Sequence, residues 1–233
     1  MTFDLVVFDM DKTLLYPARP FSDAFQLTFN FPISNCAQAW ISAVTYDGVC
    51  TGLEAVQAVL PHASKEEHEV KCRQISDAWA DCQVLYPGTL EMLASLRDSY
   101  SGKIAILTNG PSRFQRHIIE KFGLNKYVDF IFTSGDADVA RRKPSVDCFS
   151  ILQSRTGVSA ERCLMIGNSA EEDCIAAMKA GWSSIWVNPS TEGAPQFSVN
   201  KVASEFLQLA QRELGNCWVE SWQVYTGKPI RNS

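Results

Sequence analysis

The sequence predicts an α/β protein with a doubly wound parallel sheet, interrupted near its start by an all-helical insert. Three observations indicate this fold. An unbroken apolar run at residues 5–8 ends in acidic residues, a helical pattern without strands extends from about Phe21 to Cys82, and strand-like and helical segments alternate from Lys103 onward. Continuous apolar runs are typical of strands covered on both faces, and alternating strands and helices favour a parallel sheet.

Five strands separated by helices are expected in the sheet. Beyond the first, they are Lys103–Leu107, Val128–Phe132, Cys163–Ile166 and Ser184–Val187. Helices are expected at Leu90–Asp98, from Pro111 to about Phe122, at Pro144–Ser154 and at Ala170–Lys179. These segments carry apolar residues at helical spacing, and a proline at the start with a glycine just past the end is the usual asymmetry of helix ends.

The segment from Phe21 to Cys82 predicts three or four helices, because turn signals divide it into pieces. Its last helix opens with Ser64 and Glu67 at capping-box spacing. We therefore divide the chain into an α/β core, residues 1–15 and 86–233, and a helical cap domain, residues 16–85. The alternative is that these helices only cover one face of the sheet. A closing helix is expected at 202–214, and the aromatic tail is expected to pack on the domain or on a second subunit through Trp218, Trp222 and Tyr225.

Composition excludes several classes of function. The 233 residues are 46% hydrophobic and 20% charged, with a net charge of -5 and no basic block, which argues against extended nucleic-acid binding. The apolar start is short and interrupted by acids, so neither secretion nor membrane anchoring is expected, and a cytoplasmic location is the default. Eight cysteines without a C-x-x-C pair indicate reduced, mostly buried thiols.

Polar residues gather where the predicted strands end. Asp9 and Asp11 follow the first strand, Thr108, Asn109 and Gly110 follow the second, Lys143 comes after the third, and Asn168 and Asp173 come after the fourth. Because ligands of open α/β sheets bind beyond the carboxyl ends of the strands, these groups are expected to share one site. Paired acids allow one carboxylate to attack or to bind a metal while the other transfers protons.

In this order the motifs read Asp-x-Asp-x-Thr, Thr-Asn-Gly, Arg-Lys-Pro and Gly-Asn-x-x-x-x-Asp. Over roughly residues 3–187 the chain resembles the haloacid dehalogenase superfamily of hydrolases, and its helical segment resembles the cap that subfamily I members carry after the first motif. The resemblance implies that Asp9 is a nucleophile that forms an aspartyl-phosphate. It also implies that Asp11 protonates the leaving alcohol and then activates water.

The same resemblance implies a Mg²⁺ cofactor. The metal would take a carboxylate oxygen of Asp9, the backbone carbonyl of Asp11 and an oxygen from the last motif, Asn168 or Asp173. The Thr108 hydroxyl and the amides near Asn109 and Gly110 would hold phosphate oxygens, and Lys143 would neutralise nucleophile and phosphoryl charge. These roles are consistent with electrostatics, since a phosphoryl group repels an anionic nucleophile unless cations offset its charge.

Two residues depart from the family pattern. Lys12 stands where relatives often carry a small or acidic residue, and Asn168 stands where many metal-dependent members have Asp. An amide oxygen can bind Mg²⁺ but adds no charge, so weaker metal binding is expected. Asp173 would then be the acid of that motif at a matching position.

The function we expect is a magnesium-dependent phosphatase acting on a small phosphorylated metabolite, in a monomer or homodimer. The alternatives are a phosphomutase, a metal-independent 2-haloacid dehalogenase, and a non-catalytic family member. Asp11 argues against the dehalogenase, because a halide leaving group needs no acid. The turn Thr45–Gly52, with Tyr46 and Asp47, is the candidate segment for reaching over the site.

Overall fold

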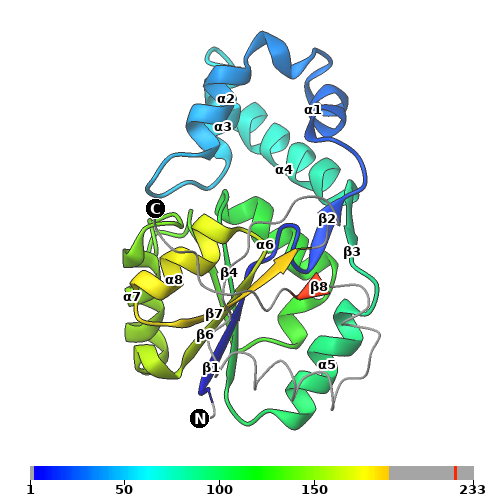
Figure 1. Cartoon of the computed structure of the whole chain (residues 1–233). Helices are drawn as coiled ribbons and strands as arrows, with labels where there is room; N and C mark the ends of the chain where they lie inside the picture. Colours follow the sequence, from blue (N-terminus) through cyan, green and yellow to red (C-terminus); the bar gives the residue numbers. More distant parts are fainter. Residues whose placement is uncertain (1–2, 189–222, 225–233) are drawn as a thin grey trace, which may run out of the picture.

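The computed structural model describes residues 3–188 and 223–224. Its centre is a six-stranded sheet in the order β5-β4-β1-β6-β7-β8 (Figure 1). The strands are β1 (Leu5–Phe8), β4 (Lys103–Thr108), β5 (Phe130–Thr133), β6 (Cys163–Gly167), β7 (Ser183–Asn188) and β8 (Gln223–Val224). Neighbours among β5, β4, β1, β6 and β7 pair in parallel, whereas β8 pairs antiparallel with β7. The predicted parallel sheet is confirmed, with an antiparallel edge strand added.

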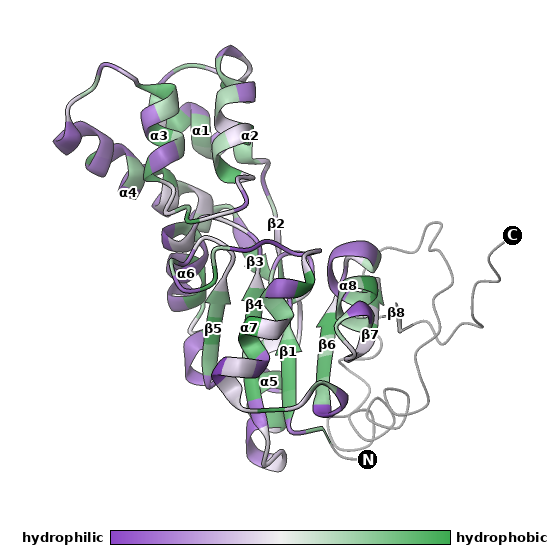
Figure 2. Cartoon of the chain, turned by 90° about the vertical axis from the view of Figure 1, so that its left-hand side faces the viewer, coloured by the Kyte–Doolittle hydropathy of each residue, from purple (hydrophilic) through white to green (hydrophobic). Residues whose placement is uncertain are grey.

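Helices cover both faces of this sheet. The core helices are α5 (Thr89–Ser99), α6 (Ser112–Lys121), α7 (Val146–Thr156) and α8 (Ala176–Lys179). In β1, Val6 and Phe8 pack into the apolar layer that contains α5 and α6, whereas Leu5 and Val7 pack into the layer that contains α7 and α8. Figure 2 shows the strands as an apolar centre between helices with hydrophilic outer faces. Two buried faces explain why this strand has no polar alternation.

Single turns complete the core and the insert. They are η1 (Ile33–Asn35), η2 (Leu124–Lys126), η3 (Ala160–Arg162) and the π-helical turn η4 (Ala170–Ile175). The sequence predicts one continuous helix at Ala170–Lys179, but its first six residues form the π-helical turn and only the last four are α-helical. Such turns widen a helix locally and are frequent at functional sites.

The helical insert, residues 21–81, lies beyond the carboxyl ends of the strands (Figure 1). It contains α1 (Phe21–Phe29), α2 (Ala37–Val44), α3 (Leu53–Val59) and α4 (Lys65–Asp81). These helices enclose an apolar cluster of their own, in which Phe25 and Trp40 are buried. The Ser64 side chain accepts a hydrogen bond from the Glu67 amide at the start of α4, as the capping-box spacing predicts.

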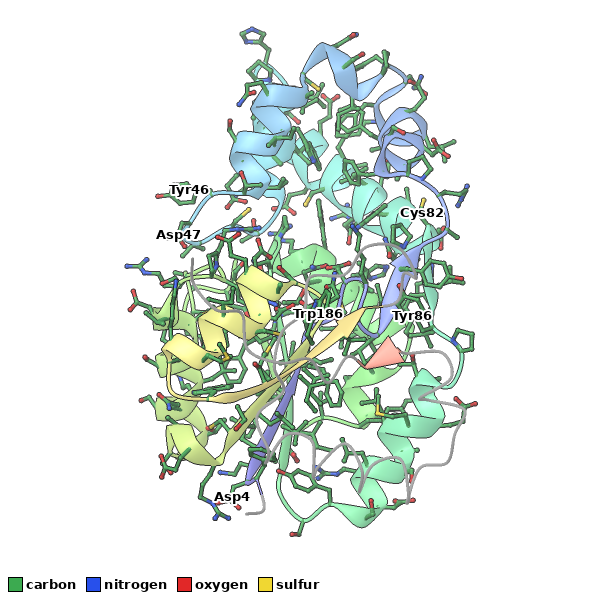
Figure 3. All side chains as sticks on the ribbon, in the orientation of Figure 1. Asp4, Tyr46, Asp47, Cys82, Tyr86 and Trp186 are labelled. Carbon is green, nitrogen blue, oxygen red and sulfur yellow. The ribbon has the colours of Figure 1, made fainter. Side chains whose placement is uncertain are left out.

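The insert is attached to the core by a ribbon, by a loop, and by ion pairs between α4 and α6 such as Arg113–Glu69 and Lys121–Asp81. A two-stranded antiparallel ribbon, β2 (Leu15–Pro17) with β3 (Gln83–Leu85), carries the chain out and back, and the sequence pattern gave no sign of it. A loop between α2 and α3 returns to the core, where the Cys50 amide donates to the Gly135 carbonyl at 3.0 Å and the Cys50 carbonyl accepts from the Ser112 amide at 2.8 Å. Figure 3 shows Tyr46 and Asp47 on this loop, and Cys82 and Tyr86 beside the ribbon.

Some expectations fall on other parts of the chain. The helix at 202–214 and the aromatic residues Trp218, Trp222 and Tyr225 lie outside the described residues. Within residues 3–188 and 223–224, no helix is long and apolar enough to cross a membrane.

Candidate active site

The ends of β1, β4 and β6 bring the predicted residues to one edge of the sheet. Asp9 follows β1 directly, and its amide donates to the Ile166 carbonyl of β6 at 2.8 Å. The chain then turns sharply, because the amides of Thr13 and Leu14 both donate to the Met10 carbonyl. The turn places the buried Thr13 hydroxyl 3.0 Å from Asp9 Oδ2. A side chain only four residues away thus holds one oxygen of the predicted nucleophile.

A buried cluster of three charges occupies the centre of the site. Lys143 Nζ lies 2.7 Å from Asp9 Oδ1 and 2.5 Å from Asp173 Oδ1. The side-chain exposures are 1% for Lys143, 9% for Asp9 and 1% for Asp173. Buried charges are tolerated only when they are paired and hydrogen-bonded, so this arrangement fixes the positions of all three groups.

The Asn109 side chain holds the Lys143 backbone from both sides. Its Nδ2 donates to the Lys143 carbonyl at 2.9 Å, and its Oδ1 accepts from the Lys143 amide at 3.0 Å. Nδ2 also lies 3.2 Å from Glu172 Oε2. The predicted role of Asn109 in phosphate binding concerned its backbone amide and stays a prediction, but its side chain acts through Lys143.

Asp173 sits in the π-helical turn η4 and uses both carboxylate oxygens. Oδ1 pairs with Lys143, and Oδ2 accepts from the Ser169 amide at 2.8 Å. Gly167, the last residue of β6, is needed for this approach, because a Cβ there would lie 2.3 Å from Asp173 Oδ2. The metal-ligand role predicted for Asp173 stays a prediction, and the contacts place it as the partner of Lys143.

Asp11 belongs to a second group of polar side chains. Its Oδ2 accepts from Gln115 Nε2 at 2.7 Å and lies 3.5 Å from the Thr108 hydroxyl. Gln115 is 5% exposed and also donates to Thr108 Oγ1 at 3.0 Å. Gly110 has a φ of +149°, and a Cβ at this position would lie 2.8 Å from Gln115 Nε2. The glycine of the second motif therefore makes room for a side chain that orients Asp11.

Three oxygens lie close together at the end of β1: Asp9 Oδ2, the Asp11 carbonyl oxygen and the side-chain oxygen of Asn168. The side-chain amide end of Asn168 lies 3.3 Å from Asp9 Oδ2 and 2.9 Å from the Asp11 carbonyl oxygen. The Asn168 backbone is held by Trp186 Nε1, which donates to its carbonyl at 2.8 Å; Trp186 is labelled in Figure 3. Adjacent ligands of an octahedral Mg²⁺ ion at about 2.1 Å are about 3 Å apart, so the spacing fits this cation.

The donor set for such an ion is one carboxylate, one backbone carbonyl and one amide. This composition explains why, among the described residues, no group of three or more His, Cys, Asp or Glu side chains is arranged as a metal site. Hard oxygen donors of this kind suit Mg²⁺ rather than softer metals. When Asn168 instead turns its NH₂ group inward, it donates to both oxygens.

Burial dominates the protonation of the two first-motif acids. It raises the pKa of Asp9 to about 7, against the opposing effect of the Lys143 charge and with a further rise from Asp173. Burial also raises the pKa of Asp11, and the hydrogen bond from Gln115 opposes that rise. Burial by itself disfavours the Lys143 ammonium, but Asp173 and Asp9 outweigh it and hold the pKa of Lys143 above its ordinary value. Lys143 is therefore a fixed cation at neutral pH.

Three supporting residues were missed from the sequence. Gln115 lies inside a helix rather than at a strand end, and Ser134 and Ser169 are ordinary loop residues by composition. Ser134 Oγ accepts from the Gly110 amide at 3.0 Å, and the Ser169 side chain caps η4 by accepting from the Glu172 amide at 3.1 Å. One signal was available for Gln115, since a polar residue on the same helix face as Phe114, Ile118 and Ile119 suggests a buried partner.

Comparison with known proteins identifies the family. A model of haloacid dehalogenase-like hydrolases matches residues 3–181 of this chain. The chain belongs to this hydrolase family. The family expectation drawn from the four motifs is thus confirmed.

Several relatives of this hydrolase carry named activities. Pyrimidine 5'-nucleotidase YjjG of Escherichia coli is 26% identical over 212 residues, which cover 84% of this chain and 91% of that protein. Phosphoglycolate phosphatase 1 of Pseudomonas aeruginosa is 25% identical over 198 residues, covering 76% and 66% of the two chains. Glyceraldehyde 3-phosphate phosphatase of Methanothermobacter thermautotrophicus is 30% identical over 116 residues, 50% of each chain.

Solved structures agree on the fold of the hydrolase. Magnesium-bound YfnB from Bacillus subtilis superposes with a TM-score of 0.61 at 21% identity, over 91% of this chain and all (100%) of that one. The 2-haloacid dehalogenase of Pseudomonas syringae gives a TM-score of 0.65 at 16% identity, over 91% and 99% of the two chains. At such identities the likeness concerns the fold alone.

The raised pKa of Asp9 makes the stability of the metal-free protein depend on pH. A carboxyl whose pKa is higher in the folded than in the unfolded state stabilises the folded protein while it is protonated. This stabilisation is fully present below the pKa of the unfolded state and is lost as the pH rises through the folded-state pKa of about 7. Asp9→Asn removes this loss. We expect the free energy of unfolding of the variant, relative to the wild type, to rise by about 2 to 3 kcal/mol between pH 5 and pH 8.

Urea unfolding in the presence of EDTA at both pH values measures this difference. Asp98→Asn, at an exposed position on α5, is the matched control and should show little change. An Asp9→Asn effect of the same size at pH 5 and pH 8 would contradict the assignment of the buried charge.

Proposed function

We propose that this hydrolase is a magnesium-dependent phosphatase that acts on a small phosphorylated metabolite through an aspartyl-phosphate on Asp9. The observation that carries the proposal is the buried Lys143 held against Asp9, with Asp11 oriented alongside by Gln115. The phosphatase and nucleotidase activities named for the relatives support it. In this proposal residues 1–15 and 86–233 form the catalytic core, and residues 16–85 form the cap.

In the first step an Asp9 oxygen attacks phosphorus while the bond from phosphorus to the ester oxygen breaks. Lys143 and the surrounding amides offset the negative charge that Asp9 and the phosphoryl group share. Asp11 gives its proton to the departing alkoxide. The raised pKa of Asp11 suits this role, since a general acid must hold its proton near the working pH.

In the second step water attacks the phosphoryl group on Asp9. Asp11, now deprotonated, takes a proton from that water. The bond between phosphorus and the Asp9 oxygen breaks, which releases inorganic phosphate and restores the Asp9 carboxylate. Thr108 and the amides of Asn109 and Gly110 are proposed to hold phosphate oxygens in both steps. Gln115 keeps Asp11 in place while its protonation alternates.

Asp9, the Asp11 carbonyl and Asn168 would hold Mg²⁺, as the spacing of their oxygens suggests. When bound, the ion supplies the positive charge that lets an anionic nucleophile approach an anionic phosphoryl group. Asp173 is then left to hold Lys143. This division assigns each acid of the site a separate task.

The test of the phosphatase proposal is hydrolysis of p-nitrophenyl phosphate and a panel of phosphorylated metabolites with Mg²⁺. Activity is expected to fall by about a thousandfold or more in Asp9→Asn, because the nucleophile is removed. Halide release from a 2-haloacid in the presence of EDTA would instead favour the dehalogenase. Transfer between two positions of one substrate without free phosphate would favour a phosphomutase, and no turnover of any kind would leave a non-catalytic protein.

Asn168→Asp is expected to tighten Mg²⁺ binding by about tenfold, because a carboxylate adds charge where the amide adds only a dipole. Isothermal titration of the resting protein with Mg²⁺ measures the affinity directly. Glu171→Gln changes an exposed carboxylate on the same turn and controls for general electrostatics. Equal affinities for Asn168→Asp and the wild type would remove the argument that the amide weakens the site.

Gln115→Met keeps the length of the side chain but removes the hydrogen bond to Asp11. We expect kcat to fall by about ten- to a hundredfold because Asp11 is no longer oriented. The pKa of Asp11 should also rise, since the lost bond favours the charged form, and this should move the alkaline limb of the pH profile of kcat/KM upward, because Asp11 must be protonated to act as the acid. Gln74→Met, at an exposed position on α4, is the control, and a lower kcat without a shifted profile would indicate a merely structural role.

A further inference from the structure

A cavity of about 400 Å³ opens where the helical insert meets the core. Asp11 and Gln115 lie at its core end together with the backbone of the second motif. The other side chains in its wall are mostly apolar and come from both parts of the chain: Pro17, Phe21, Trp40, Val44, Thr45, Trp79, Pro111, Phe114 and Arg142, with Lys12. The cavity therefore begins at the proton donor and extends away from it, in the direction a leaving alcohol would occupy.

Four aromatic rings line this wall. Trp40 and Phe114 stack with their ring centroids 6.2 Å apart and an angle of 15° between the planes. Phe21 lies 5.2 Å from both Trp40 and Trp79 by the same measure. Trp40 and Phe114 are buried, with exposures of 4% each, whereas Phe21 and Trp79 are half-buried. Rings packed against one another in this way keep their positions, so the apolar wall is preformed.

The cavity also contains a cation with unused hydrogen-bond donors. The Arg142 guanidinium donates to the Val44 carbonyl at 3.0 Å and approaches Ser134 Oγ at 3.4 Å, both through Nη1. Among the described residues it forms no ion pair within 4.0 Å. Its other nitrogens are available to carbonyl oxygens of a ligand, since a guanidinium presents five N–H groups.

The size and chemistry of the cavity indicate what kind of leaving group it can accommodate. Pockets of about 300 to 1,000 Å³ enclose ligands much larger than a two- or three-carbon acid. A glycolate or serine moiety would leave water against the aromatic walls, which is unfavourable. A flat ring can instead stack on an aromatic side chain, and such stacking contributes about 1 to 3 kcal/mol per base. Carbonyl groups on that ring would meet the donors of Arg142.

Resting on the phosphatase proposal, we infer that this cavity receives the base of a nucleoside 5'-monophosphate, with the ring against Phe21 and Trp79 and a carbonyl edge toward Arg142. The base then supplies binding energy at a distance from the phosphoryl group. Binding energy from such remote parts of a substrate positions the reacting atoms. The insert thus selects the substrate through its rings.

Uridine 5'-monophosphate and ribose 5-phosphate form the test pair, since they share the phosphate and the sugar and differ in the base. We expect kcat/KM to be about ten- to a hundredfold higher for the nucleotide, as the stacking contribution implies. Trp79→Leu and Phe21→Leu should each lower the ratio between the two substrates by about fivefold or more. Two variants are used so that the test does not depend on one substitution leaving the packing of the insert intact, and thermal unfolding identifies a variant that fails to fold.

Leu27→Ala, on the same helix as Phe21, is the control, because Leu27 is 68% exposed and does not line the cavity; the ratio of kcat/KM between the two substrates should equal that of the wild type. Similar kcat/KM values for the two substrates in the wild type would overturn the inference and leave the phosphatase proposal standing. Calorimetric binding of both substrates to Asp9→Asn gives an independent measure. Preferential binding of the nucleotide there, with no turnover by the wild type, would support the inference and contradict the phosphatase.

Discussion

The ion cluster of Lys143 with Asp9 and Asp173 is the constraint on which the site depends. Removing three charged groups from water is costly, and only close pairing makes it tolerable. The surrounding chain is arranged to keep that pairing: Asn109 brackets the Lys143 backbone, the Ser169 amide holds Asp173, and Gly167 leaves space for it. These contacts come from the ends of β4 and β6, which flank β1 in the sheet, so the order β4-β1-β6 is what brings them to Asp9.

The chain divides the two demands of the proposed reaction between its two parts. The core presents charged groups on rigid strand ends, where positions are set by backbone pairing. The helical insert presents apolar rings on helices joined to the core by a short ribbon and by the Cys50 backbone. The ester oxygen would lie where these parts meet, near Asp11. Selectivity in the insert can therefore vary without disturbing the buried ion cluster.

The sequence predicted the parts of this structure that follow from periodicity and strand ends. Asp9, Asp11 and Thr108 were found because polar residues that follow apolar runs meet at one edge of a parallel sheet. Lys143 was found because it comes after the third predicted strand, in the order of the family motifs. Gln115 was missed because its contact with Asp11 joins residues 104 positions apart. The aromatic wall was missed for the same reason, since Phe21, Trp40 and Trp79 come from separate helices whose relative positions the sequence pattern does not show.

The amide at Asn168 has a consequence for the charge of the proposed site. With Asp9 and Asp173 ionised, Lys143 protonated and Asp11 holding its proton, the cluster carries one net negative charge. A bound divalent cation would change this to one positive charge, whereas a carboxylate at position 168 would leave the loaded site neutral. On this charge count the amide would weaken metal binding and would strengthen the attraction for a phosphate dianion once the metal is bound. If Mg²⁺ binds as proposed, an amide instead of a carboxylate at position 168 favours substrate binding at the expense of metal binding.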